Sequence, residues 1–410
     1  MEYEYLQFSR FYNQHVHLGI TGSIAAFKSL QICRELMDFG IQVSVTLTSA
    51  ARNFVTPLSF EALGITPVYG EMFSPQNNAF AHLEPSETAQ AFLIAPSTAN
   101  NIAKLAYGLA DDMLTCQALA FNGPLLLAPA MNPNLWSAQP TQENIQKLTQ
   151  RGNMVLGPKS GEVACGHTGE GRLTSIPEIV FNTLNAICNK DMKDQNVLIT
   201  LGATREYWDP ARFWSNPSSG KMGAALAIAA WLRGANVHCI CGPNKAWLPG
   251  DITSYDVTSA RQMFDKTLEL WPNTDIACLC AAVSDFRPES VSETKFKKQE
   301  KIQENPDHLN LNFTANPDIL QTLGERKTNS QKLVGFAAET DDDLFPEMKS
   351  KLHKKNLNLI VSNKINQSGT GFGSDNNEVN LLDDKSNHQQ LPTLNKADIA
   401  WKIWDWTLKI

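Results

Sequence analysis

The chain has 410 residues, of which 42% are hydrophobic and 19% charged, and its formal net charge is −7. This length suffices for two domains with separate cores, and the composition excludes a disordered chain. The acidic balance argues against a nucleic-acid surface, which needs excess positive charge. We expect no membrane span, because no apolar run approaches 18 residues, and no secretory signal, because residues 1–14 carry two early acids and no apolar stretch.

Eight cysteines are scattered along the chain, and two C-x-C pairs, Cys239/Cys241 and Cys278/Cys280, fall within apolar runs that predict strands. Alternation along a strand would point both thiols of a pair to one face, which leaves a zinc site open. Buried core cysteines are the favoured interpretation. Reduced thiols fit a cytoplasmic location, which we expect for this protein.

The first half of the sequence alternates predicted strands and helices. Residues 15–20 predict a strand, helical spacing follows as far as Gly40, and residues 41–47 predict a second strand. This βαβ pattern indicates a parallel sheet. The turn between the first strand and the helix, Thr21-Gly22-Ser23, can offer backbone N–H groups to a phosphate. A tight turn without a ligand explains those residues equally well.

Two later strands also end in polar loops. Residues 91–94 lead into Pro96-Ser97-Thr98-Ala99-Asn100-Asn101, and residues 125–128 lead into the segment 129–136, PAMNPNLW. The carboxyl ends of parallel strands lie at one edge of a doubly wound sheet, where ligands bind. Three such loops together therefore predict a ligand site at this edge.

The segment Gly161–Arg172 has four glycines in twelve residues around Cys165. This glycine content does not favour helix or strand, so we predict a mobile flap that carries Cys165 over a site. His82 stands in a polar stretch and, taken alone, is an ordinary surface histidine.

These motifs together resemble those of the flavin-containing cysteine decarboxylases, and among them the phosphopantothenoylcysteine decarboxylases. The resemblance rests on GITGSIAAFK, PSTANN, PAMNPNLW and CG-x-x-G-x-GR, and it covers about Val16–Ala186. One departure is Leu135, where the family has Met. The resemblance implies a flavodoxin-like fold that binds FMN. The implied FMN contacts are Gly22, Ser23, Thr48, Thr98, Asn100 and Asn101.

The same resemblance implies a chemistry. The cysteine thiol of 4′-phospho-N-pantothenoylcysteine is oxidised to a thioaldehyde, CO₂ leaves, and the resulting enethiol is reduced and protonated to 4′-phosphopantetheine. His82 would act as the base, Asn132 would hold the substrate carboxylate, and Cys165 would supply the proton. An imidazole titrates near neutrality and suits proton transfer.

A second domain is predicted to begin near Val197. The segment before it, NKDMKDQ, reads as a junction, so we expect domains at 1–190 and 191–410. A strand from Val197 meets Gly202, a polar loop bears Asn216, and Gly220-Lys221-Met222-Gly223 opens an Ala-rich helix before a strand at 237–241. The fold class is therefore α/β, with two Rossmann-like domains, the second with a parallel-rich sheet.

The rest of the second half carries chemically suggestive segments past its predicted strands. A strand over 275–283 precedes the run Lys295-Phe296-Lys297-Lys298, and Lys351 and Lys355 share one face of a helix. A lysine cluster is ordinarily a solvated loop. Because this cluster follows the carboxyl end of a predicted strand, its position favours a phosphate-binding role over a solvated loop.

These segments resemble the phosphopantothenate–cysteine ligases of bacterial type, over about Val197–Leu382. The resemblance implies that CTP and Mg²⁺ activate 4′-phosphopantothenate as an acyl-cytidylate, which the amine of cysteine then attacks. Asn216 would contact this intermediate and Lys295 the reacting phosphate, while the metal ligand stays unassigned. Asn358 departs from a common acidic residue. The implied substrate and CTP contacts are Ala281, Asp285, Asn316, Pro317, Asp318, Ile319, Phe336, Lys351 and Lys355, together with Lys295.

The two resemblances describe successive steps of one route, so we expect a fused enzyme of coenzyme A biosynthesis with small-molecule substrates and neither nucleic-acid nor membrane partners. The family also implies a homo-oligomer, with trimeric decarboxylase domains, dimeric ligase domains and a dodecamer of the whole. Two alternatives are a flavin- or NADP-dependent oxidoreductase and a non-catalytic flavoprotein. The first predicts a full G-x-G-x-x-G motif, which neither half has.

Overall fold

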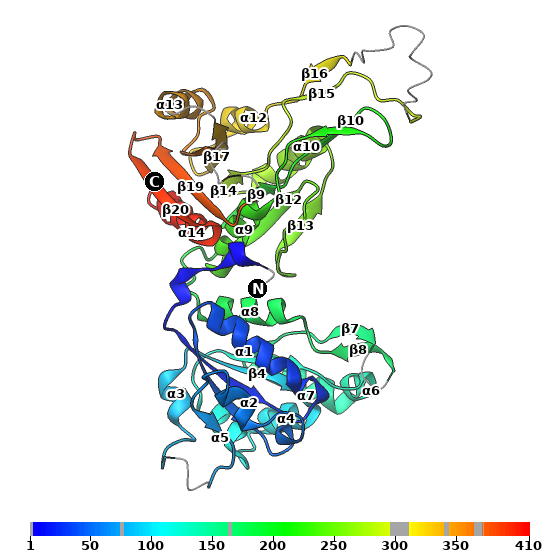
Figure 1. Cartoon of the computed structure of the whole chain (residues 1–410), viewed down its shortest axis with the longest axis vertical. Coiled ribbons are helices and arrows are strands. Elements are labelled where there is room, and N and C mark those ends of the chain that lie inside the picture. The colour runs from blue at the N-terminus through cyan, green and yellow to red at the C-terminus, as the bar shows by residue number, and fades with distance from the viewer. Residues whose placement is uncertain are drawn as a thin grey trace. The chain divides into compact units, whose positions relative to one another are not determined.

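The computed structural model describes residues 3–73, 78–162, 166–295, 311–339, 344–364, 371 and 373–410. The chain forms two compact units, an N-terminal unit of Ser9–Cys188 and a C-terminal unit of Asn189–Ile410 together with Met1–Phe8 (Figure 1). The sequence placed the domains at 1–190 and 191–410; in the structure the division falls between residues 188 and 189, and residues 3–8 group with the C-terminal unit. Within the described ranges, no helix is long and apolar enough to cross a membrane.

The N-terminal unit is a six-stranded parallel sheet in the order β3-β2-β1-β4-β5-β6. This is the Rossmann order, with the reversal of chain direction between β1 and β4. The expected flavodoxin-like fold is confirmed in its architecture, which is a doubly wound parallel sheet. The strands are β1 His15–Ile20, β2 Gln42–Leu47, β3 Val68–Tyr69, β4 Ala91–Ser97, β5 Leu125–Pro129 and β6 Met154–Val155.

Helices cover this sheet because its strands are buried on both faces. Every residue of β4 is buried, as is typical of a parallel strand between two helical layers. The helices are α1 Ser29–Asp38, α2 Pro57–Glu61, α3 Glu84–Thr88, α4 Ala99–Tyr107, α5 Met113–Ala120, α6 Pro133–Ser137, α7 Gln139–Gln150 and α8 Ile176–Ile187. A separate hairpin, β7 Lys159–Glu162 and β8 Thr168–Arg172, follows β6.

The C-terminal unit contains an eight-stranded sheet in the order β13-β12-β9-β14-β17-β18-β19-β20. The first six are parallel and repeat the Rossmann order, and the last two are antiparallel, so the expected parallel-rich sheet is confirmed. Its strands are β9 Asn196–Leu201, β12 Asn236–Cys241, β13 Thr253–Asp256, β14 Ile276–Leu279, β17 Lys332–Glu339, β18 Leu359–Lys364, β19 Asn376–Asp383 and β20 His388–Asn395.

The Ala-rich helix α9 (Lys221–Leu232) is buried all round from Gly223 to its end. It packs against β9 and β12 on the sheet and against α14 (Lys396–Thr407). Gly223 permits the close approach, because a Cβ atom there would lie 2.4 Å from Cβ of Leu201. The beginning of α9 is therefore fixed at the carboxyl end of β9.

Three further helices flank the sheet: α10 Ala260–Leu270, α12 Ile319–Arg326 and α13 Phe345–Lys354. Two short antiparallel pairs form an arm beside the sheet (Figure 1). The arm strands are β10 Arg205–Tyr207, β11 Phe213–Ser215, β15 Phe286–Pro288 and β16 Phe313–Ala315.

The C-x-C cysteines are core residues, as the favoured interpretation held. Cys239, Cys241 and Cys278 are buried in β12 and β14, and burial raises the pKa of each thiol. Cys280 lies just past β14, half-buried, and burial raises its pKa to about 12. These four thiols are therefore protonated at neutral pH. Across the residues that the structure describes, no group of three or more metal-ligating side chains is found.

Candidate active sites

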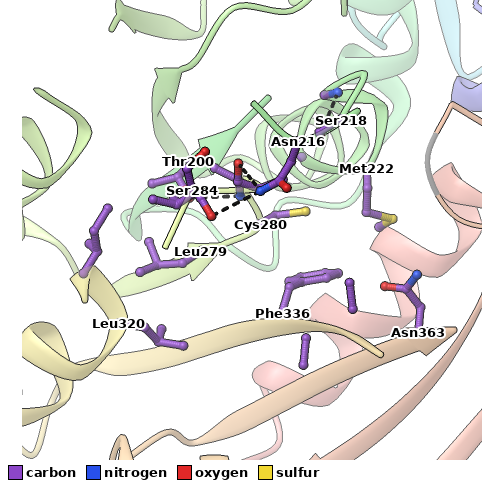
Figure 2. A pocket seen from close by; sticks show the side chains of 18 of the residues that line it. Thr200, Asn216, Ser218, Met222, Leu279, Cys280, Ser284, Leu320, Phe336 and Asn363 are labelled. Atoms are coloured by element: carbon purple, nitrogen blue, oxygen red, sulfur yellow. Dashed lines mark hydrogen bonds between the residues drawn. The ribbon is translucent and has the colours of Figure 1, made fainter. Parts of the chain in front are cut away.

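A cavity of about 550 Å³ opens in the C-terminal unit where β9, β14 and β17 end (Figure 2). It lies at the reversal point of the Rossmann-like strand order, where ligands of such sheets bind. Nearly all the ligase-site residues expected from the sequence line it. They are Asn216, Ala281, Asp285, Asn316, Pro317, Asp318, Ile319, Phe336, Lys351 and Lys355.

Two side-chain amides in this pocket are oriented by the loop that follows β14. Nδ2 of Asn216 donates to the carbonyls of Ala282 at 3.4 Å and Val283 at 3.3 Å. Nδ2 of Asn316 donates to the carbonyl of Ser284 at 2.8 Å. These bonds orient both amides, and Phe336 on β17 faces Asn216 across the pocket (Figure 2).

The two lysines on the α13 side of the pocket are held by carboxylates. Lys351 bonds Glu339 at the end of β17 and lies 2.8 Å from Glu347, and Nζ of Lys355 lies 2.8 Å from Asp318. Burial alone would lower the pKa of Lys351, but the hydrogen bonds to its two carboxylates outweigh this effect and raise it. Both lysine side chains are therefore held in place by carboxylates before an anionic ligand arrives.

The pocket has a second cationic end that sequence reasoning missed. Lys221, the first residue of α9, lies 2.7 Å from Asp375 and donates to the carbonyl of Gly373 at 3.0 Å. Lys396, the first residue of α14, also lines the pocket. The sequence offered a signal for Lys221, which follows Gly220 at a helix start, but none for Lys396.

Lys396 is 3% exposed and donates to the backbone carbonyls of Gly371, at 3.0 Å, and Ser374. Burial, and next the positive charge of Lys221, lower its pKa to about 8, although Cys280 and Asp375 act in the opposite direction. The ammonium group thus loses its proton in mildly alkaline solution, unlike an ordinary surface lysine.

Lys295 is the one expected ligase-site residue that does not line this pocket. It is exposed, in the segment after β15 on the arm, and is the last described residue before 296–310. The neighbouring lysines of the predicted phosphate-binding cluster, Lys297, Lys298 and Lys301, lie outside the described residues. The described part of the arm extends away from the eight-stranded sheet of its own chain (Figure 1).

In the N-terminal unit, the loops after β1, β2 and β4 meet at one edge of the sheet, and the first and third are tied together. Thr21 Oγ1 donates to the carbonyl of Pro96 at 2.7 Å and accepts from the backbone N–H of Thr98 at 3.1 Å. A Cβ atom on Gly22 would lie 2.5 Å from Cβ of Ala50, so only glycine fits this turn. These contacts fix the backbone at the start of the η3 turn (Ile24–Lys28) against the loop after β2.

The other expected flavin contacts occupy different environments. Ser23 caps η3, Thr98 caps α4, and Oγ1 of Thr48 accepts from the N–H of Ala51 at 3.2 Å. Asn100 is exposed at the first turn of α4. Asn101 is only 3% exposed, and its Oδ1 accepts a hydrogen bond from Ser97 at 3.0 Å, so its side chain is committed to the interior of the loop.

Asn132 begins α6, and its side chain is held on two sides. Its Oδ1 accepts from the N–H of Asn134 at 2.9 Å, and its Nδ2 lies 3.2 Å from Nδ1 of His167. His167 immediately precedes β8, so the hairpin β7–β8 reaches the Asn132 loop. The sequence did not single out His167.

The glycine-rich segment forms this hairpin rather than an irregular loop. Its glycines allow a close approach, since a Cβ atom on Gly171 would lie 2.2 Å from the carbonyl oxygen of Met131, whose N–H donates to Gly171 at 2.9 Å. Cys165 itself lies outside the described residues, in the segment 163–165 between β7 and β8 in the sequence.

His82 lies in the turn that leads into α3 and is half-buried. The preceding residue, Ala81, accepts a hydrogen bond from Nε2 of Gln117 at 3.0 Å. Figure 1 places α3 on the opposite side of the N-terminal unit from α6 and the hairpin β7–β8. A single chain therefore does not bring His82 to Asn132.

The fold defines a two-unit α/β protein in which polar loops gather at the carboxyl edge of each Rossmann-like sheet, with a cavity at that edge in the C-terminal unit. The family model described as "Flavoprotein" matches residues 9–188, and the model described as "DNA/pantothenate metabolism flavoprotein C-terminal domain" matches residues 192–410. The chain belongs to the family of coenzyme A biosynthesis bifunctional proteins, whose members match it along almost their whole length.

Two such relatives illustrate the match. The bifunctional protein CoaBC of Haemophilus influenzae is 40% identical over 392 residues, which cover 94% of this chain and 95% of the relative. That of Vibrio vulnificus is 38% identical over 387 residues, with the same coverage. A crystal structure of the C-terminal domain of a CoaBC protein is 34% identical, with a TM-score of 0.44, and covers 53% of this chain and 96% of that domain.

Proposed function

We propose that the protein carries out two successive steps of coenzyme A biosynthesis. The C-terminal unit joins cysteine to 4′-phosphopantothenate with CTP, and the N-terminal unit decarboxylates the product to 4′-phosphopantetheine. The observation that carries the proposal is full-length membership of a bifunctional family, together with two sites whose residues suit the two chemistries.

For ligation, the proposal assigns the pocket of the C-terminal unit to CTP and 4′-phosphopantothenate. It is supported by lysines at both ends, Lys221 and Lys396 near α9 and Lys351 and Lys355 near α13, because a triphosphate needs several cations. Asn216, fixed by two backbone carbonyls, would orient the acyl-cytidylate while the amine of cysteine attacks. We assign Mg²⁺ to the nucleotide phosphates, where this ion keeps most of its water ligands.

For decarboxylation, the proposal assigns FMN to the carboxyl edge of the N-terminal unit, where Thr21 joins the loops after β1 and β4 and the η3 turn and α4 begin side by side. Bound FMN would supply the oxidation of the substrate thiol and the later return of electrons. Asn132 would hold the substrate carboxylate until CO₂ leaves, His82 would accept the thiol proton, and Cys165 would protonate the enethiol carbon.

The proposal includes a homo-oligomer in which neighbouring copies complete both sites. The separation of His82 from Asn132 supports this for decarboxylation, and the position of Lys295 off its own pocket supports it for ligation. Large exposed apolar side chains on the N-terminal unit, such as Phe27 and Leu58, also suit contacts between copies. Trimeric N-terminal units, paired C-terminal units, a dodecamer and a cytoplasmic location stay predictions.

One incubation tests the whole proposal. Purified protein is supplied with 4′-phosphopantothenate, cysteine, CTP and Mg²⁺, and the products are followed by mass. The expected products are CMP, CO₂ and 4′-phosphopantetheine, with bound FMN visible in the absorption spectrum. Flavin-bound protein that changes neither substrate would point to the non-catalytic alternative, and absence of any CTP-dependent adduct would refute the ligase assignment.

The ligation step should also weaken above about pH 8. Lys396, with its pKa lowered to about 8, is a cation below this pH and becomes neutral above it. Since an anionic ligand favours the cation, KM for the ligand that meets Lys396 should rise up to about tenfold per pH unit in this range. Steady-state kinetics at pH 7 to 9.5 would measure the effect.

The matched control for this pH dependence is Lys396→Met, which removes the titrating group. The variant should bind more weakly at pH 7 and should lack the rise above pH 8. The same rise in both proteins would assign the effect to another group.

A further inference from the structure

The first described residues of the chain form part of the C-terminal unit. Residues 3–8, which include the short helix η1 (Glu4–Leu6), leave Leu6 fully buried and Phe8 1% exposed. The ring of Phe8 packs edge-on against Trp401 of α14, with the centroids 6.0 Å apart. The ring of Tyr3 lies 5.2 Å from that of Trp247. Residues 3–8 therefore pack at a defined position on the C-terminal unit, their seat, although they belong to no strand of its sheet and to none of the sequence motifs.

The seat lies at the beginnings of two helices that line the pocket. η1 packs against α9 and α14, whose first residues are Lys221 and Lys396. Asn395, which caps α14 by accepting from the N–H of Ala397 at 3.1 Å, also donates to the carbonyl of Glu4 at 2.7 Å. The segment is thus joined by a hydrogen bond to the cap of the helix that bears Lys396.

Tyr5, the middle residue of η1, is buried and presents its ring to Lys221. Nζ of Lys221 lies 5.6 Å from the ring centroid, within the range of a cation–π interaction. Burial raises the pKa of the phenol, so the ring stays neutral beside the cation. Lys221 is consequently held by three partners, the ring of Tyr5, the carboxylate of Asp375 and the carbonyl of Gly373.

Holding a lysine in place matters for binding. A free lysine side chain loses rotamer freedom when a ligand immobilises it, and a lysine fixed in advance avoids this cost. Lys221 lines the cavity, beside the beginning of α9, where the helix dipole also favours an anion.

We propose that residues 3–8 are a positioning element of the ligase pocket, in which Tyr5 holds Lys221 in place for a phosphate group of the ligand. The inference rests on the proposed function only in taking the ligand to carry phosphate. Two phosphates are available, the triphosphate of CTP and the monoester of 4′-phosphopantothenate. The test separates them.

The test compares the full-length protein with Tyr5→Phe and Tyr5→Leu. Phe keeps the aromatic face, whereas Leu keeps an apolar group of moderate size without one. We expect Tyr5→Phe to stay within twofold of the parent, and Tyr5→Leu to raise KM for one of the two substrates about three- to tenfold, with kcat changed less than twofold. The substrate whose KM rises identifies the phosphate that meets Lys221. Decarboxylation of supplied 4′-phospho-N-pantothenoylcysteine should not change.

A second pair of variants guards against a purely structural effect. In a Lys221→Met background, Tyr5→Leu should add nothing to the loss of affinity, because Tyr5 acts through Lys221. Any of three results would overturn the proposal. Tyr5→Leu could weaken binding further in the Lys221→Met background, Tyr5→Leu as a single substitution could leave KM unchanged, or Tyr5→Phe and Tyr5→Leu could raise KM equally.

Calorimetric titration of the same proteins with inorganic tripolyphosphate and inorganic phosphate measures binding without turnover. Weaker binding of one anion to Tyr5→Leu alone supports the positioning role even if the protein proves not to ligate cysteine. Equal binding of both anions to all three proteins would refute it. Failure of the proposed function and failure of this inference are therefore distinguishable.

Discussion

Replacement of Lys295 by Ala is expected to lower the ligation rate by two to three orders of magnitude, the usual loss when a fixed charge at a reacting group is removed. Lys295 is exposed and does not line the pocket of its own chain, so its loss should not disturb the pocket. Decarboxylation of supplied 4′-phospho-N-pantothenoylcysteine should be unaffected. A coupled assay for CMP release and a separate assay for CO₂ would measure the two effects.

The sharper experiment pairs this variant with Asn216→Ala, which alters the pocket itself. If Lys295 serves the pocket of a neighbouring copy, co-expression of the two inactive chains creates mixed pairs with one intact site. About a quarter of the parent ligation activity should then return. If Lys295 serves the pocket of its own chain, the mixed preparation should stay as inactive as either variant. Lys349→Ala on α13 is a suitable control for simple loss of a surface cation, because Lys349 does not line the cavity.

Replacement of Cys165 by Ser is the second large effect that we expect. The sulfur would be replaced by a hydroxyl group, which is a far weaker acid, so protonation of the enethiol should slow by at least about a hundredfold. The oxidised, decarboxylated intermediate should accumulate. Mass spectrometry should detect it about 46 mass units below the substrate, because one CO₂ and two hydrogens have been lost. Ligation should continue at the parent rate.

The matched control is Cys116→Ser. Cys116 is a half-buried free cysteine on α5 in the same unit, and no chemistry is assigned to it. This variant should keep both activities. Normal decarboxylation by Cys165→Ser would instead show that the proton comes from another group, and His167, 3.2 Å from Asn132, would be the next residue to examine.

The positions of the polar loops could be predicted from the sequence because they depend on local patterns. An apolar run that ends in small polar residues predicts a strand end, and parallel strands bring such ends to one edge. Gly22, Thr98, Asn132 and Asn216 therefore lie where they were expected. Asn101 was less predictable, since a local pattern does not tell whether an amide turns outward or bonds Ser97 within the loop.

Other features depend on contacts between residues far apart in the chain. Lys396 reaches the pocket only because α14 packs on α9, and nothing around it in the sequence indicates a ligand site. The seat of residues 3–8 depends on aromatic side chains more than 200 positions away, such as Trp247 and Trp401. The separation of His82 from Asn132 likewise follows from the position of α3 in the N-terminal unit. The hydrophobic periodicity of the sequence predicts a helix but not where that helix packs.

The seat of residues 3–8 has a consequence for how the protein is made. This segment is synthesised before the N-terminal unit, whereas α14, on which Phe8 packs, is synthesised after it. At about 5 to 20 residues per second, the apolar side chains of Leu6 and Phe8 wait for tens of seconds while the N-terminal unit folds. The C-terminal unit is therefore completed only after α14 has emerged, when residues 3–8 can dock onto it.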